Sequence, residues 1–349
     1  MNIDEILTGI ESPVFNQIDH DKIANPIVFI VCSKWTNFLN SRSVQSFLVY
    51  KQEFYEKKYN KTSQLITLNP DNTFDESLKI LSENSIISAP VIGEEQTLEE
   101  FKGFIDILDI FVLISYIFQR QKFYKEIEYS ITEIFNQSLK SAINFSSLFD
   151  SRPIYDNMSL LQALEVLLMP GSPFRGHRLA VFNSKTNKII GILSQSDILN
   201  LARENLHQLT PHSQKTPKEL KIMKPVISIP SNTLSKDAFL LLHANRVNGI
   251  AIVDPQNGKL IHSLSTSDLK YLSKSEVYLI SLPISKYLEY IKNSNLTKKL
   301  IIVNSQSKLF DIVNIMCNHR VHRVYINDDD DKPCAVITIS DVLSTILNC

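Results

Sequence analysis

Four aspartates stand at matching places in the sequence, and three of them follow a hydroxyl residue at a fixed distance. These three end the segments Ser194-Gln195-Ser196-Asp197, Ser265-Thr266-Ser267-Asp268 and Thr338-Ile339-Ser340-Asp341. The fourth, Asp109, follows Asp106 in place of a hydroxyl residue. A carboxylate can accept two hydrogen bonds from a diol, and a helix N-terminus behind it favours an anion. The motif therefore suits a ligand that carries both hydroxyl and anionic groups.

Two His-Arg pairs add positive charge at strand starts. His177-Arg178 and His322-Arg323 each precede an apolar, β-branched run. Arginine can form bidentate, charge-assisted hydrogen bonds with phosphate oxygens, and histidine donates according to its protonation. The alternative is that such pairs are exposed edge residues, and two pairs at equivalent positions make the two interpretations about equal in weight.

The hydroxyl-aspartate motif also has a purely structural interpretation. Ser/Thr-x-x-Asp before an apolar helix resembles a capping box, in which hydroxyl and carboxylate satisfy the first backbone amides. For one isolated copy, capping is favoured by about three to one. Three full copies and one variant favour ligand binding for at least one of them.

The motif stands before the last helix of a repeated unit. In each copy a β-branched run, a polar turn, a second apolar run and a helix with apolar residues on one face follow one another. A further strand and helix precede this group, so each unit is predicted as strand, helix, strand, strand, helix. The predicted first helices include 74–83, 234–243 and 309–319. Such units bury their apolar faces against their neighbours.

Composition sets limits on function. The chain has 349 residues, 44% hydrophobic and 21% charged, with a net charge of -1, so a general attraction to nucleic acid or membrane is not expected. Its four cysteines lack metal-ligand spacing, which favours reduced thiols in the cytosol or nucleus. The longest apolar run, 111–118, is too short for a membrane span and predicts a buried helix. The acidic run 328–331 is predicted to be a solvated turn.

The repeats resemble the CBS domain, named for cystathionine β-synthase. Four copies with His177-Arg178 in the second and His322-Arg323 in the fourth look most like the γ regulatory subunit of AMP-activated, SNF1-type protein kinase. The resemblance implies an α+β fold of four repeats paired into two modules and packed as a disc. It also implies a non-catalytic sensor of AMP, ADP and ATP, with kinase catalytic and scaffold subunits as partners and no cofactor or metal.

By resemblance, the nucleotide-binding residues are those of the motif, the basic strand starts and one loop. They are His177, Arg178, Ser194, Asp197, Asn248, Gly249, Ser265, Thr266, Ser267, Asp268, His322, Arg323, Thr338, Ile339, Ser340 and Asp341, with Asp106 and Asp109 as weaker candidates. Asn248-Gly249 is also an ordinary entry from a loop into a strand.

Two positions depart from the family. Ile87 and Ser196 stand where the kinase subunit carries basic residues, which removes phosphate-neutralising charge. This leaves two alternatives open: an interaction scaffold of the same fold with weak or no nucleotide binding, and a sensor of another adenosyl ligand. No phosphate-binding glycine loop, nucleophile elbow or zinc cluster is visible, so an enzyme is not expected.

The predicted boundaries follow the repeats. They are an N-terminal extension at 1–62, CBS units at 63–120, 151–206, 221–275 and 297–349, and a linker at 207–220 rich in proline and small polar residues. Within the extension we expect a buried strand at 27–32, an amphipathic helix at 44–58 and Trp35 as extra core. The stretch 119–150 is predicted to add helix.

Overall fold

The computed structural model describes residues 34–59, 64–123, 130–143, 145, 152–169, 177–209, 211–271, 275–293 and 299–347. These residues form four copies of one α+β unit, called units 1 to 4 in chain order. The strand predicted at 27–32 lies outside the described residues.

Each unit centres on an antiparallel hairpin that a helix precedes and another helix follows. Unit 1 contains α4 (Phe74–Glu83), β1 (Ser88–Val91), β2 (Gly103–Asp106) and α5 (Ile107–Phe123). Unit 2 contains β3 (Ile154–Tyr155), α7 (Leu160–Leu168), β4 (Arg178–Phe182), β5 (Ile189–Ser194) and α8 (Gln195–Leu209). Unit 3 contains β6 (Ser228–Pro230), α9 (Ser235–Ala244), β7 (Gly249–Val253), β8 (Leu260–Ser265) and η4 (Thr266–Tyr271). Unit 4 contains α11 (Leu309–His319), β9 (Arg323–Asn327), β10 (Pro333–Thr338) and α12 (Ile339–Leu347).

The first strand of the predicted unit is complete in only two copies. In units 2 and 3 it is β3 and β6, which pair in parallel with β4 and β7. In units 1 and 4 it shrinks to single parallel bridges, Leu68 with Val91 and Ile302 with Tyr325. The prediction of a strand at these two places was therefore too long, because each run forms only one bridge pair with the neighbouring strand.

The last helix of unit 3 also differs from the prediction. It is a 3-10 helix, η4, rather than an α-helix. The hydroxyl of Tyr287, on α10 (Ile284–Asn293), donates to the carbonyl oxygen of Asp268 at 2.7 Å. A continuing α-helix would use that carbonyl itself, so this contact competes with the helical hydrogen bond.

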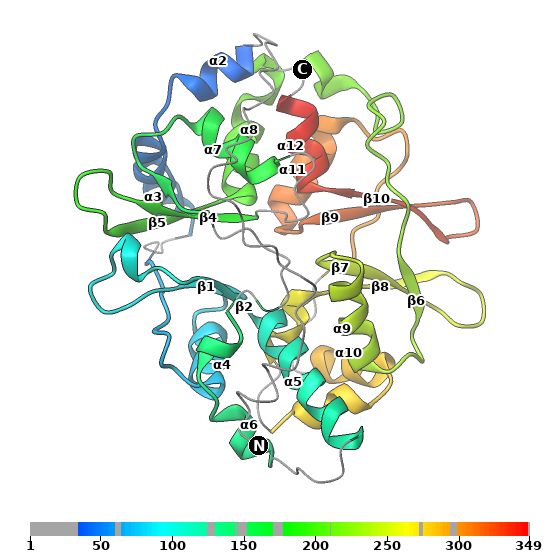
Figure 1. Ribbon diagram of the computed structural model, residues 1–349. Coiled ribbons are helices and arrows are strands. Elements are labelled where there is room, and N and C mark those ends of the chain that lie inside the picture. The colour runs from blue at the N-terminus through cyan, green and yellow to red at the C-terminus, as the bar shows by residue number, and fades with distance from the viewer. Residues whose placement is uncertain are drawn as a thin grey trace.

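The four units form two layers around a common centre (Figure 1). One hydrophobic core joins the helices of units 1 and 3, and another joins those of units 2 and 4. The hairpins meet between the layers: β1 and β2 face β4 and β5, while β7 and β8 face β9 and β10. A small apolar cluster lies in each sheet contact, with Phe104 and Phe182 on one side and Ala251 and Tyr325 on the other.

The described part of the N-terminal extension belongs to the layer of units 2 and 4. It consists of α2 (Lys34–Asn40) and α3 (Val44–Tyr59), close to the helix predicted at 44–58. Trp35 is 1% exposed in the core that these two units share. Its prediction as extra core is confirmed.

Two other segments connect the units. The stretch 119–150 contains the end of α5, the short helix α6 (Ile131–Phe135) and a 3-10 turn, Leu139–Ser141. Helix α8 extends to Leu209, inside the segment 207–220 predicted as a linker, and a 3-10 turn, Pro211–Gln214, follows. The predicted buried helix at 111–118 lies within α5, where Phe111 and Leu113 are at most 3% exposed.

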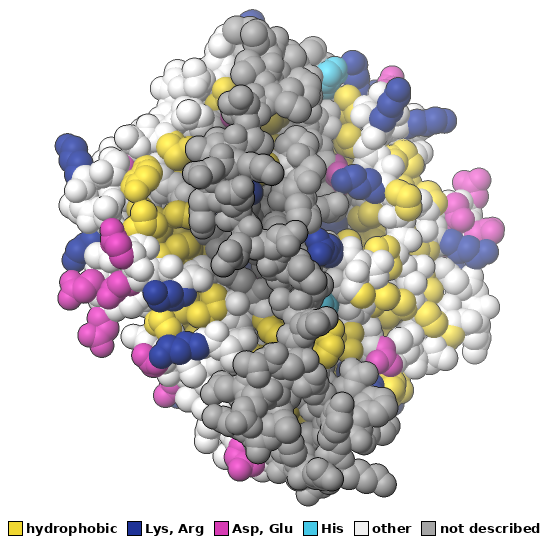
Figure 2. Space-filling model, in the orientation of Figure 1, with side chains coloured by type: hydrophobic (Ala, Val, Ile, Leu, Met, Phe, Trp, Pro, Cys, Tyr) yellow, Lys and Arg dark blue, Asp and Glu magenta, His cyan; other side chains and the backbone are white. Residues whose placement is uncertain are grey.

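The acidic run 328–331 is a turn, as predicted. It joins β9 and β10, and its aspartates pair with exposed lysines: Asp331 with Lys259 at 2.8 Å and Asp330 with Lys332 at 3.5 Å. Charges of both signs gather at this tip in Figure 2.

Candidate functional site

A cavity lies at the centre of the molecule, where all four units meet. The hairpin registers give it its symmetry, because Ser88 pairs with Asp106, Arg178 with Ser194, Gly249 with Ser265 and Arg323 with Thr338. The residues before these strand starts are equivalent as well: Ile87, His177, Asn248 and His322 each accept an amide hydrogen bond from the first residue after the second strand. Each unit therefore presents the same strand start and helix start to the cavity.

Most of the predicted binding residues line this cavity. They are Asp106, His177, Arg178, Ser194, Asn248, Gly249, Ser265, Thr266, Ser267, His322, Arg323, Thr338, Ile339 and Ser340. Asp109, Asp197, Asp268 and Asp341 stand behind the lining and are at most 6% exposed.

The aspartates of the motif cap helices. Asp197 Oδ2 accepts from Ser194 N and Oγ at 2.9 and 2.8 Å, and Asp341 Oδ2 accepts from Thr338 N and Oγ1 at 2.9 and 2.6 Å. Asp268 does the same with Ser265. In unit 1, Asp109 Oδ2 accepts from Asp106 N at 2.6 Å. The carboxylate half of the capping box is therefore present in every unit, and these bonds all end at one carboxylate oxygen, Oδ2. The hydroxyl half, a donation from the aspartate's own backbone N, is formed in units 2 and 4.

Lysines from other segments lie against two of these carboxylates. Lys51 of α3 donates to Asp197 Oδ2 and to the carbonyl oxygen of Ile192, both at 2.8 Å. Lys224, whose backbone bridges to Val336, forms an ion pair with Asp341 Oδ1. Ile192 and Val336 occupy the same position, two residues before Ser194 and Thr338. The motif aspartates of units 2 and 4 thus each have a lysine partner from outside the motif.

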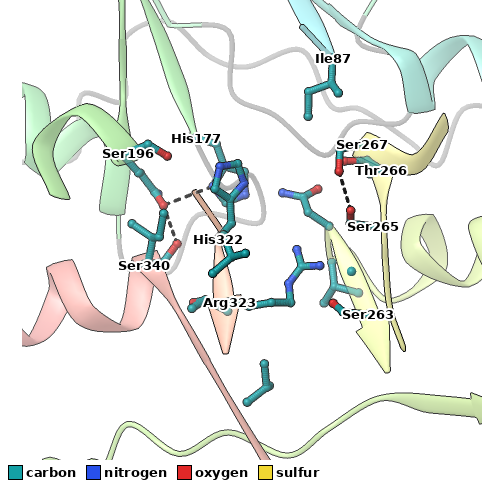
Figure 3. A pocket seen from close by; sticks show the side chains of 18 of the residues that line it. Ile87, His177, Ser196, Ser263, Ser265, Thr266, Ser267, His322, Arg323 and Ser340 are labelled. Carbon is teal, nitrogen blue, oxygen red and sulfur yellow. Dashed lines mark hydrogen bonds between the residues drawn. The ribbon is translucent and has the colours of Figure 1, made fainter. Parts of the chain in front are cut away.

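The two arginines of the His-Arg pairs reach across the sheet contacts. Arg178 donates a hydrogen bond to Ser88, its equivalent in unit 1. Arg323 lies over Gly249, its equivalent in unit 3, and a Cβ added at Gly249 would overlap the guanidinium. In Figure 3 the Arg323 side chain extends from its strand towards the strands of unit 3. A small residue at each partner position makes room for the arginine.

The surroundings of Arg178 are ionic, and the residue is partly buried. Burial lowers the pKa of Arg178, while the charges of Asp106 and Asp197 oppose the shift. Asp106 is fully buried. Burial first, and then the charge of Asp109, raise the pKa of Asp106 to about 7, against the hydrogen bond from Leu108 N and the attraction of Arg178.

A hydrogen-bond chain connects units 2 and 4 across the cavity wall. Ser340 Oγ donates to Gln195 Oε1 at 2.8 Å, and the same oxygen lies 3.3 Å from His177 Nδ1 (Figure 3). In unit 3, Ser265 Oγ and Ser267 Oγ are 2.6 Å apart. The lining therefore offers hydroxyl, amide and imidazole groups beside its charges.

Sequence reasoning missed four cations in the lining: Lys224, Arg246, Lys299 and Arg320. Arg246 and Arg320 share a left-handed backbone, φ 51° and 52°, three residues before the strand start. That spacing repeats in the sequence at Arg175, Arg246 and Arg320, and it is the signal that could have found them.

The resulting electrostatics favour an anion. Lys224, Arg246, Lys299, Arg320, Arg178 and Arg323 line one cavity together with two histidines, and Asp106 is the acidic residue among the lining residues. Several cations around a hollow focus positive potential inside it. Elsewhere in the described residues, no group of three or more His, Cys, Asp or Glu side chains is placed to hold a metal ion, and no helix is long and apolar enough to cross a membrane.

Four equivalent units around a shared cavity define a protein of tandem α+β repeats. The profile of the CBS domain family matches residues 59–116, 151–204, 218–274 and 294–348. The chain belongs to the CBS domain family.

The chain is similar in sequence to protein kinase γ subunits. The "5'-AMP-activated protein kinase subunit gamma" of Dictyostelium discoideum is 25% identical over 301 residues, which cover 82% of this chain and 50% of that protein. The subunit of the same name from Saccharomyces cerevisiae is 24% identical over 303 residues, covering 81% and 87%. The chain thus spans half of the first relative and most of the second, and it resembles the γ subunits in sequence.

A solved structure has the same fold. A Methanocaldococcus jannaschii protein, proposed as an archaeal homologue of γ-AMPK, superposes with a TM-score of 0.64 at 15% identity, covering 81% of this chain and 96% of that one. The match establishes the four-repeat α+β fold.

Proposed function

We propose that this protein is a non-catalytic sensor of adenine nucleotides that regulates a protein kinase of the AMP-activated, SNF1-type class. The observation that carries the proposal is the central cavity, where six lysine and arginine side chains and two histidines from units 2, 3 and 4 line one space. Phosphate groups are the anions that such a donor set suits best, because arginine and lysine neutralise their charge and donate hydrogen bonds.

The repeat arrangement supports regulation rather than chemistry. A ligand that contacts several units at once favours the relative arrangement in which all of its contacts form. A partner that prefers the same arrangement then binds more tightly when the ligand is present. The γ subunits that this chain resembles are named as subunits of a kinase, which is why a kinase catalytic subunit and a scaffold subunit are the proposed partners, in the cytosol or nucleus.

The first test is calorimetric titration of the full chain with AMP, ADP and ATP, each against wild type and Arg323→Ala. We expect saturable binding by the wild type and a loss of about thirtyfold in affinity for the variant, the order of one charge-assisted contact to phosphate. Lys286→Ala is the matched control, since Lys286 is exposed and pairs with Glu289 away from the cavity. A folded protein that binds none of the three nucleotides would disprove the proposal.

The kinase partnership needs its own test. The tagged full chain is purified from its native cells with and without added AMP, and the co-purifying proteins are identified. Recovery of a kinase catalytic subunit in amounts that change with AMP is the expected result. Repeated recovery of no kinase component would refute the kinase half and leave the nucleotide sensor standing.

A second candidate function is an interaction scaffold of the same fold. The pairing of Lys51 with Asp197 and of Lys224 with Asp341 favours it, because both carboxylates already have cationic partners. The scaffold predicts partner binding that is indifferent to nucleotide. A third candidate, a sensor of another adenosyl ligand, predicts that adenosyl compounds with fewer phosphates compete for the same cavity.

A further inference from the structure

Asp106 is the exception among the four equivalent positions at the cavity. Its equivalents Ser194, Ser265 and Thr338 are hydroxyl residues, whose side chains donate to the capping aspartates. Asp106 Oδ1 accepts from Leu108 N at 3.0 Å. Within the described chain, Asp106 Oδ2 is buried without a hydrogen-bond partner although the residue lines the cavity. A buried carboxylate oxygen without a donor is costly, so a donor from a ligand would relieve it.

The charges around Asp106 make its side of the cavity unlike the other. The charges of Arg178 and Asp109 shift the pKa of Asp106, and the charge of Asp197 shifts the pKa of Arg178. Arg178 also donates a hydrogen bond to Ser88. The nearest cation on this side is thus already shared among carboxylates. On the other side, Arg323 faces Gly249 and the acidic residue is replaced by Ser265. An anion therefore meets buried carboxylates beside Arg178, whereas beside Arg323 the equivalent of Asp106 is the uncharged Ser265.

We propose that Asp106 is a specificity-determining residue that excludes phosphate from the Arg178 side of the cavity and accepts a hydrogen bond from an uncharged amino or hydroxyl group of the ligand. The phosphates then face the Arg323 side. The inference rests on the nucleotide-binding function proposed above and gives the ligand a direction in the cavity. It also makes a bare polyphosphate a poor ligand, because such a molecule has no neutral donor for Asp106.

The exclusion depends on pH. Since the pKa of Asp106 is about 7, its carboxylate repels phosphate above this pH and becomes a neutral acid below it. The other ionisable groups near Asp106 are His177 and His322 in the lining and Arg178, Asp109 and Asp197 around the site. A comparison of wild type with Asp106→Asn separates the effects, because the histidines are common to both proteins.

The test measures tripolyphosphate, ATP and adenosine binding to the full chain by calorimetry at pH 6 and pH 8. At pH 8 we expect Asp106→Asn to bind tripolyphosphate about tenfold more tightly than the wild type does, the order expected for removing one charge beside an anion site. At pH 6 the two proteins should differ by less than about twofold, because wild-type Asp106 is then mostly protonated. Adenosine binding should weaken in the variant.

Two further variants keep the outcome interpretable. Asp106→Ser carries the residue type found in units 2 and 3 and should reproduce the gain in tripolyphosphate binding. Asp75→Asn, at an exposed position of α4, changes the net charge equally and should leave binding unchanged. Melting curves of all variants establish that they are folded.

The results separate this inference from the proposed function. If the wild type binds AMP but neither Asp106 variant gains affinity for tripolyphosphate at pH 8, the inference is overturned and nucleotide binding stands. If the gain is equal at pH 6 and pH 8, the proton dependence is wrong. If no protein binds any nucleotide while the Asp106 variants still gain tripolyphosphate affinity, the proposed function fails and the charge exclusion remains.

Discussion

The two His-Arg pairs occupy equivalent positions, yet the molecule surrounds their arginines differently. Arg178 donates to Ser88 and lies near the carboxylates of Asp106 and Asp197, whereas Arg323 lies over Gly249, whose strand partner is Ser265 in place of an aspartate. The same two residue types therefore have buried carboxylates nearby on one side and a glycine backbone on the other. The difference comes from their partners in units 1 and 3 rather than from the pairs themselves.

The largest effect on this comparison should come from the charge of Asp106. Its pKa rises from an ordinary 3.8 to about 7 on folding, so ionised Asp106 destabilises the folded state, and this penalty grows as pH rises from about 4 to 7. The difference corresponds to roughly 4 kcal/mol. Urea denaturation of Asp106→Asn should show a gain in the free energy of unfolding of that order at pH 8. At pH 5 the gain in the free energy of unfolding should be less than half of its value at pH 8. A gain that does not vary with pH would contradict the buried, ionisable Asp106.

The second effect concerns the arginines themselves. Arg178→Ala should lower the free energy of unfolding at pH 7 by about 3 kcal/mol, because buried Asp106 loses a nearby cation and Asp197 keeps only Lys51. Arg323→Ala is the matched comparison. It should lower the free energy of unfolding by less than about 1 kcal/mol and should weaken nucleotide binding instead. Equal destabilisation by the two substitutions, measured by urea denaturation, would remove the distinction between the two sides.

A third prediction tests the support behind Arg178. Lys51 and Asp197 have side chains that are 16% and 3% exposed, and Asp197 acts in turn on Arg178. Lys51→Met should lower the free energy of unfolding by about 2 kcal/mol, since Asp197 loses a buried partner while keeping its capping bonds. Lys57→Met, at an exposed position of the same helix, is the control and should be nearly neutral. Equal effects of the two changes would mean that the Lys51 ion pair adds nothing.

The smallest predicted effect tests the contact between Arg323 and Gly249. Gly249→Ala adds a Cβ in the place of the Arg323 guanidinium, so the arginine must move away from unit 3. We expect about tenfold weaker AMP binding in calorimetry. In an Arg323→Ala background the same change should have little further effect, because the two residues act through one contact. Additive losses would show that Gly249 acts without Arg323.

The repeated motif allowed much of the fold to be predicted. Asp197 and Asp341 lie in the first turn of helices as expected, and the predicted helices 74–83 and 309–319 coincide with α4 and α11. Local patterns succeed here because caps, apolar spacing and turns act within a few residues. The first strands of units 1 and 4 were predicted too long, because strand length depends on how far the backbone follows its partner strand, here to one bridge each at Leu68 and Ile302.

The candidate site was predicted in part for the same reason. His177, Arg178, His322 and Arg323 line the cavity as the motif indicated, although their ligand roles stay predictions. The hydrogen bond of Arg178 to Ser88 could not be foreseen, because the two residues are 90 positions apart. Nor could the lysine at Asp197, which comes from a helix outside the repeats.

By itself, the sequence determined the number of units, the order of their elements and the residue types at each strand start and helix start. These follow from local periodicity and capping, which act over one or two turns. Only the tertiary structure decided which strand starts face each other, and so which arginine lies near buried carboxylates and which lies over a glycine. Burial and charge pairing are properties of neighbours in space, and the chain brings those neighbours together from different units.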